Sequence, residues 1–132
     1  MIGLDTNILL RYQLQDDPSQ SPIVNRLFEQ ELRPDNQGYV SLATSLEIVW
    51  VLRSVWKLKP REIAAALREL LAHDALRFQN ELEVAAAVSA LQQGTGEFED
   101  ALIGALNRWS GCTESVTFDQ KAARLPYFRL LA

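Results

Sequence analysis

Four acidic residues stand out because local structure gives each of them little reason to be where it is. They are Asp5, Glu47, Asp100 and Asp119. The first and the last follow strand-like runs, the second interrupts an apolar helix, and the third has another acid one turn before it. Carboxylates that are scattered along a chain but gathered by the fold are suitable ligands for hard divalent cations. The pattern therefore predicts a metal site built from carboxylates.

Asp5 and Asp119 each have a second explanation that concerns structure alone. Aspartate accepts backbone N–H hydrogen bonds at helix starts, so either residue can be a helix cap. Asp119 can also pair on the surface with Lys121 or Arg124, an interaction that adds little stability. For both acids, capping and metal binding are equally favoured by the local sequence. For Asp5 the two roles are also compatible, because an acid at the end of a strand can face a crevice.

Glu47 is the acid that is hardest to explain by local structure. It sits at the edge of a broad apolar helical surface, so we expect its carboxylate to be partly buried. The residues three and four positions away are Ala43, Thr44, Trp50 and Val51, and none of them is a cation. A partly buried carboxylate without a partner is costly. This context favours a functional role for Glu47.

Asp100 lies opposite the apolar face of a predicted helix over residues 97–109, a face that includes Trp109. Periodicity alone makes Asp100 a solvated acid, and the helix dipole favours negative charge in the first turn. Against this, Glu97 is a like charge three residues earlier, with no cation one turn on. A divalent ion would relieve that repulsion. We expect Gly104 to leave the surface one turn below Asp100 open.

Length and composition describe an ordinary globular chain. Its 132 residues suit one domain, and 48% of them are hydrophobic and 23% charged. The single cysteine, Cys112, excludes a disulfide framework or a cysteine-rich zinc site and fits a reducing, cytoplasmic setting. We see neither a signal peptide nor an apolar run near the ~20 residues that span a bilayer, so no membrane partner is expected. The net charge of −4 argues mildly against a general nucleic-acid binder, although bound cations would reverse the local field.

Strands and helices are predicted to alternate along the chain. The strands are expected over residues 1–5, 39–42, 76–79 and 115–118. The helices are expected over 18–32 (with Ile23 on its apolar side), over 43–57, from Pro60, after a capping box of Asn80 with Glu83, over 97–109, and briefly near 119. Alternation implies crossover connections. We therefore predict an α/β fold of one domain over residues 1–132, with a mainly parallel central sheet of about four to five strands and helices on both faces. In such sheets ligands bind beyond the carboxyl ends of the strands, where Asp5 and Asp119 lie.

The order of the acids, together with their neighbours, resembles the PIN-domain nucleases, and most closely the VapC-type toxins of toxin–antitoxin pairs. The resemblance covers nearly the whole chain. It rests on four segments: Ile2-Gly3-Leu4-Asp5-Thr6-Asn7-Ile8-Leu9-Leu10-Arg11, Leu46-Glu47-Ile48-Val49-Trp50-Val51-Leu52, Phe98-Glu99-Asp100-Ala101-Leu102-Ile103 and Thr117-Phe118-Asp119. The first and third segments are fairly specific alone, and the four in this order are strongly so.

The resemblance implies that the four acids named above are the metal-binding and catalytic residues. Asp5 and Asp100 are expected to hold the main ion and the last acid a second, weaker one, while Glu47 acts through a water. Asn7 and Thr117 match positions that support the site. Glu97 falls where many relatives carry an additional acid. A site of carboxylates without histidine or cysteine suits one or two ions of Mg²⁺ or Mn²⁺.

The implied activity is endoribonuclease cleavage, in which a metal-activated water hydrolyses an RNA phosphodiester bond. Scattered bases would bind the substrate, with Arg11 near Asp5 first, then Arg108 and Lys121. The resemblance also implies a homodimer and a cognate antitoxin. The antitoxin would dock on the helices within residues 43–72 and cover the acidic crevice.

Two other functions stay open. The first is a phosphatase or phosphotransferase with Asp5 as nucleophile, although a haloacid-dehalogenase-type site wants a second Asp where Asn7 stands. The second is a non-catalytic, acidic interaction module that a metal stabilises. The only histidine, His73, lies in a turn-like segment, so a Ser-His-Asp triad or a two-histidine metal site is excluded.

Overall fold

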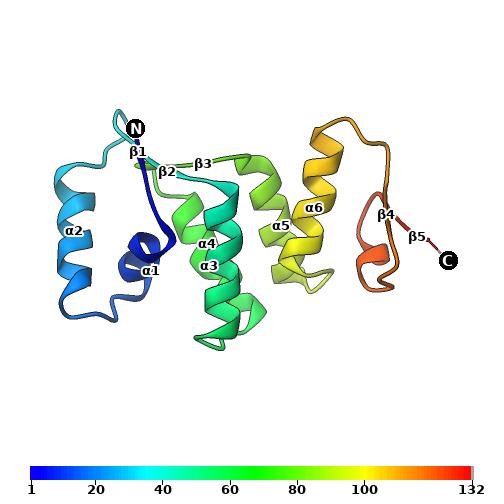
Figure 1. Cartoon of the computed structure of the whole chain (residues 1–132), viewed down its shortest axis with the longest axis horizontal. Coiled ribbons are helices and arrows are strands. Elements are labelled where there is room, and N and C mark those ends of the chain that lie inside the picture. The colour runs from blue at the N-terminus through cyan, green and yellow to red at the C-terminus, as the bar shows by residue number, and fades with distance from the viewer. Residues whose placement is uncertain (132) are drawn as a thin grey trace.

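The computed structural model describes residues 1–131 as six helices and five short strands, with one 3-10 turn. In chain order the elements are β1 (Ile2–Gly3), α1 (Thr6–Leu14), α2 (Gln20–Gln30), β2 (Gly38–Val40), α3 (Leu42–Ser54), α4 (Pro60–Leu71), β3 (Leu76–Phe78), α5 (Glu81–Gln93), α6 (Phe98–Trp109), β4 (Ser115–Thr117), η1 (Ala122–Arg124) and β5 (Phe128–Leu130). Figure 1 shows an elongated molecule with α2 at one end and the β4–β5 pair at the other.

The strands form two parallel sheets rather than one. The first sheet has the order β1-β2-β3, and the second contains only β4 and β5. Every strand pair is parallel, so the predicted α/β class and parallel sheet are confirmed. β2 is the middle strand of the first sheet, and α5 and α6 stand between this sheet and the β4–β5 pair (Figure 1).

One apolar core joins the first sheet to the helices. It runs from Leu4, just after β1, to Leu102 on α6, and includes Val40 and Phe78 from the two other strands. On α4 the apolar stripe of Ile63, Leu67 and Leu70 is buried, with Leu67 fully enclosed. Burying one such side chain is worth about 1.5–3 kcal/mol. The core therefore holds the first sheet and its helices as one body.

Most predicted elements are present, with boundaries shifted by a few residues. Pro60 is the first residue of α4, where its missing N–H costs nothing. Two elements were not predicted: α1, which starts directly after Asp5, and β5, which is only three residues long. No helix among residues 1–131 combines the length and the apolar character that crossing a membrane requires.

Three local predictions were wrong. Asn80 has a left-handed backbone, and its side-chain amide donates to Oε1 of Glu83 at 3.0 Å instead of capping α5. Ile23 and Trp109 are exposed, although periodicity put them on apolar faces. Ile23 lies on α2 and Trp109 on α6. The apolar side of each helix is wider than the surface that packs against it, so these two residues at its edge meet solvent.

The C-terminal unit, which we define as residues 115–130 (β4, η1 and β5), packs on α6. The guanidinium of Arg108 lies 3.7 Å from the centre of the Tyr127 ring, a cation–π contact. Nδ2 of Asn107 donates to Oγ of Ser115 at 2.9 Å. Phe128 lies against Gly104, where a Cβ would come within 2.5 Å of its ring. The C-terminal unit is thus attached to the side of α6 that faces away from the first sheet (Figure 1).

Candidate functional site

Asp5 sits in the two residues between β1 and α1 and caps the helix. Its backbone is extended, and its Oδ1 accepts the N–H of Thr6 at 2.8 Å. The residue is nevertheless exposed, so its second oxygen is free to face the edge of the sheet. Asp5 therefore caps α1 and is also exposed near the end of β1, so the two roles are compatible, as expected.

Asp119 organises the turn that follows β4. Its Oδ1 accepts the backbone N–H groups of Lys121 at 2.8 Å and of Ala122 at 3.1 Å. Its own N–H donates to Oγ1 of Thr117 at 3.0 Å. Thr117 was predicted to support the site, and its hydroxyl oxygen accepts the hydrogen bond that fixes Asp119. The ammonium of Lys121 points elsewhere, to 4.0 Å from Oε1 of Glu97.

Asp100 lies in the first turn of α6 among other negative charges. Partial desolvation raises the pKa of its carboxyl, and the charges of Glu97 and Asp119 raise it further. The 4.0 Å contact of Lys121 with Glu97 likewise places the start of α6 close to the turn after β4. The repulsion expected between Glu97 and Asp100 is present. The prediction that Gly104 leaves open surface was wrong, because Gly104 is buried under Phe128.

Glu47 is exposed, so the expectation of a partly buried carboxylate was wrong. The helix α3 is apolar on two sides, but only the side with Ile48, Val49 and Leu52 is buried. The other side, with Leu46 beside Glu47, meets solvent. Burial therefore cannot be the reason for an acid here.

By the elements that carry them, the acids fall into two groups. The first group, Asp5 and Glu47, comes from elements that follow the paired strands β1 and β2. The second group, Asp100 and Asp119 with Glu97, comes from α6 and the C-terminal unit. Within residues 1–131 no three acidic, histidine or cysteine side chains lie close enough together to hold an ion. The carboxylate chemistry suits Mg²⁺ or Mn²⁺, but the arrangement inside a single copy of the chain does not.

The basic residues predicted to bind substrate all have partners within the chain. Nη1 of Arg11 donates to both carboxylate oxygens of Asp16 at 2.9 Å. Arg108 stacks on Tyr127, and Lys121 lies beside Glu97. Of these, Lys121 is the cation closest to the second acid group. Asn7 is exposed on α1, two residues after Asp5.

A contact between α3 and α6 was missed by the sequence analysis. Nη1 of Arg53 donates to Oε1 of Glu99 at 3.1 Å, and a second bond joins the other pair of atoms. Hydrogen bonding from Arg53 holds the pKa of the Glu99 carboxyl below its usual value. The two residues are 46 positions apart, so no local spacing signals the pair. It fixes the start of α6, and with it Asp100, against α3.

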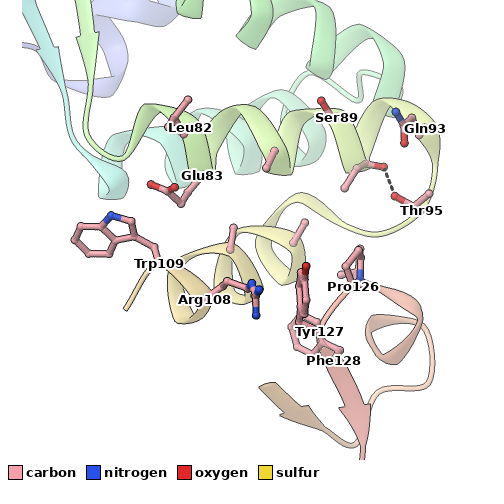
Figure 2. Close-up of a pocket in the computed structure, with 16 residues that line it drawn as sticks. Leu82, Glu83, Ser89, Gln93, Thr95, Arg108, Trp109, Pro126, Tyr127 and Phe128 are labelled. Atoms are coloured by element: carbon pink, nitrogen blue, oxygen red, sulfur yellow. Dashed lines mark hydrogen bonds between the residues drawn. The ribbon is translucent and has the colours of Figure 1, made fainter. Parts of the chain in front are cut away.

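A hollow of about 540 Å³ lies between α5, α6 and the C-terminal unit. Figure 2 shows Leu82 and Trp109 at one end, with Tyr127 and Phe128 across from α5. Its lining is mostly apolar, and none of the five acids of the two groups belongs to it. The hollow is therefore separate from the candidate acidic site.

Comparison with protein families places almost the whole chain. A model of the PIN domain matches residues 2–126. Searches of curated proteins and of solved structures gave no significant match. PIN domains are generally nucleases, which hydrolyse phosphodiester bonds, and they typically use divalent metal ions. With that match over its full α/β core, the chain belongs to the PIN domain family.

Proposed function

We propose that this protein is a metal-dependent endoribonuclease and the toxin component of a toxin–antitoxin pair. The observation that carries the nuclease is the second acid group. Desolvation and the charges of Glu97 and Asp119 raise the pKa of Asp100, so a cation bound beside it would stabilise its carboxylate. Family membership and the four acids in family order support the same activity.

The chain's own residues have distinct tasks in this proposal. Asp5 and Asp100 would hold the main ion once the two groups are brought together, and Glu47 would act through a water. Thr117 fixes the turn that presents Asp119 for a second ion. When bound, Mg²⁺ or Mn²⁺ supplies water activation and neutralises phosphate charge.

RNA cleavage by the purified chain tests the activity. Cleavage should require Mg²⁺ or Mn²⁺, stop with EDTA, and fall at least about 100-fold in Asp5→Asn and in Asp119→Asn. Asp35→Asn is the matched control, because Asp35 is an exposed acid in the turn before β2. Cleavage that survives both EDTA and Asp5→Asn would contradict the proposal. Hydrolysis of phosphate monoesters with RNA left intact would favour a phosphatase.

The antitoxin is proposed to dock on α3 and the segment that follows it. Large apolar side chains are exposed there: Leu46, Trp50, Val55 and Trp56. Contiguous exposed apolar surface of this kind marks protein interfaces, and tryptophan is enriched among residues that dominate binding energy. The partner expected is a small DNA-binding protein, and we expect its gene beside the gene of this chain.

Co-expression with that neighbouring protein tests the docking surface. Trp50→Arg should weaken the complex by at least about 10-fold, which corresponds to the loss of about 1.4 kcal/mol. Trp109→Arg is the matched control, because Trp109 is also exposed but lies on α6. Equal affinity of both variants would move the docking surface away from α3.

A further inference from the structure

The division of the acids into two groups needs a physical explanation. Asp5 is the second residue after β1 and Asp119 the second residue after β4, yet these strands lie in different sheets. If β1 and β4 were neighbours in one parallel sheet, their carboxyl ends would meet at the same edge. Each of the two strands has an edge that could accept a neighbour.

The edge of β1 that faces away from β2 is open. The N–H of Ile2 donates to the carbonyl of Gln37 at 2.9 Å, and the N–H of Leu4 donates to the carbonyl of Tyr39 at 3.0 Å. The backbone of Gly3 between them therefore faces the other way. Gly3 is exposed, and β1 is the outer strand of its sheet. Another strand can therefore approach this edge.

The edge of β4 that faces away from β5 is open as well. The N–H of Ser115 donates to the carbonyl of Tyr127, and the carbonyl of Thr117 accepts the N–H of Leu131, both at 2.8 Å. The backbone of Val116 therefore faces away from β5. The side chains of this segment are apolar but unprotected, since Val116 is 52% exposed and Phe118 81% exposed. A sheet of only two strands is marginally stable by itself, so an additional neighbouring strand would stabilise it.

The C-terminal unit cannot reach β1 of its own chain without leaving α6. The contacts of Phe128 with Gly104 and of Arg108 with Tyr127 hold it on the far side of that helix (Figure 2). Leu125 packs at Gly96 in the same way, at the other end of α6. A second copy of the chain can supply β4 to β1 with all of these contacts intact.

We propose that β4 of one copy pairs in parallel with the open edge of β1 in a second copy, and that the exchange is reciprocal. Each of the two resulting sheets then has the order β3-β2-β1 followed by β4 and β5 of the other copy. Each acidic site takes Asp5 and Glu47 from one copy and Asp100 and Asp119 from the other. A reciprocal contact of this kind closes as a two-fold dimer. The role of the acids rests on the nuclease proposed above, whereas the strand pairing does not.

The substitution Val116→Pro tests the pairing independently of activity. It removes only the N–H that faces away from β5, so the β4–β5 pair keeps its bonds but cannot extend. Light scattering after gel filtration should show a dimer for the natural chain and for Val116→Thr. Val116→Pro should weaken the dimer at least about 10-fold. Gly3→Pro should do the same from the other edge.

These mass measurements overturn the pairing in two ways. A natural chain that is monomeric at micromolar concentration contradicts it. So does a dimer that both proline variants leave unchanged, provided their circular dichroism shows that they are folded.

Complementation tests whether the site is shared. Two copies with different affinity tags, one with Asp5→Asn and the other with Asp119→Asn, are co-expressed and isolated as the mixed dimer by both tags in turn. In a shared arrangement one site of this dimer carries both substitutions and the other carries none. The mixed dimer should therefore recover about half of the natural activity, at least ~50-fold above either variant alone if each loses ~100-fold.

Matched pairs from one acid group provide the control. Asp5→Asn with Glu47→Gln, and Asp100→Asn with Asp119→Asn, leave every shared site damaged and should stay inactive. No recovery in the first mixed dimer would show that each copy completes its own site. If the natural chain itself cleaves no RNA, the nuclease fails, and the mass measurements alone decide the pairing.

Discussion

The two parallel sheets of this protein differ in how much of their surface is covered. In β2 and β3 the first and last residues are buried, and Val40 is fully enclosed. The C-terminal unit contributes only Ser115, Ala122 and Leu125 to the buried residues, and it shows Val116 and Phe118 to solvent. Stability therefore resides in the first sheet and its helices, while the proposed chemistry needs acids from both regions.

This difference in burial affects how accurately each region can place an acid. The first region can hold its shape alone because three strands and their helices share one core. The C-terminal unit has helix α6 on one side and little on the other, so its order depends on a few contacts. Regions with few buried apolar contacts open at low free-energy cost. An acid carried on such a unit, as Asp119 is, is placed accurately only when the unit is held by further contacts.

Matched leucine substitutions should separate the two regions most strongly. Leu67→Ala removes a fully buried side chain from the core and should lower the free energy of unfolding by about 2–5 kcal/mol. Leu130→Ala changes a residue that is 37% exposed in β5 and should cost less than about 1 kcal/mol. Guanidinium denaturation measures both values. Equal losses would mean that the C-terminal unit is as tightly packed as the core.

The attachment of the C-terminal unit to α6 should respond to one methyl group. In Gly104→Ala the new Cβ would lie 2.5 Å from Cε2 of Phe128, so the ring must move. We expect a loss of about 1–3 kcal/mol in the free energy of unfolding. Adding Phe128→Leu should restore part of it, because the shorter side chain leaves room for the methyl group.

Gly3→Ala is the control for that substitution, since a Cβ there meets nothing. Its free energy of unfolding should change by less than about 0.5 kcal/mol. If Gly104→Ala were as mild as Gly3→Ala, the contact between β5 and α6 would contribute little to stability.

Local patterns predicted the elements well and their assembly only in part. The stripe of α4, the start of that helix at Pro60 and the periodic helix α6 follow from side-chain spacing, which local structure must obey. The short strand β5 was missed because its three residues, Phe128–Leu130, are not part of a longer run of alternating polar and apolar residues. Its existence depends on pairing with β4, which is a tertiary event.

The candidate site shows the same limit. Type and order identified the acids, and Thr117 was expected beside the site and does bind the N–H of Asp119. Spacing could not reveal that Glu47 is exposed, because a helix with two apolar sides does not specify which of them its neighbours cover. Nor could it reveal that Arg53 holds Glu99, or that β1 and β4 lie in separate sheets.

The smallest expected effect concerns the electrostatics of the second acid group. Asp100→Asn removes a charge that desolvation and Glu97 disfavour, so the metal-free variant should be slightly more stable at neutral pH. Like charges one helical turn apart cost about 0.2–0.5 kcal/mol, which is a rise in Tm of about 1–2 °C for a domain of this size. The pKa of Asp100 is raised in the folded state, so its penalty exists above that pKa and disappears as the pH falls through it. The advantage of the variant should therefore vanish at acidic pH, and thermal melting at neutral and acidic pH in EDTA measures it.

With Mg²⁺ added at neutral pH, the order of stability should reverse, because only the natural chain then gains stability from the ion. A variant that is less stable than the natural chain in EDTA would show that helix-dipole stabilisation of Asp100 outweighs the repulsion, and would remove the main support for a cation at this group.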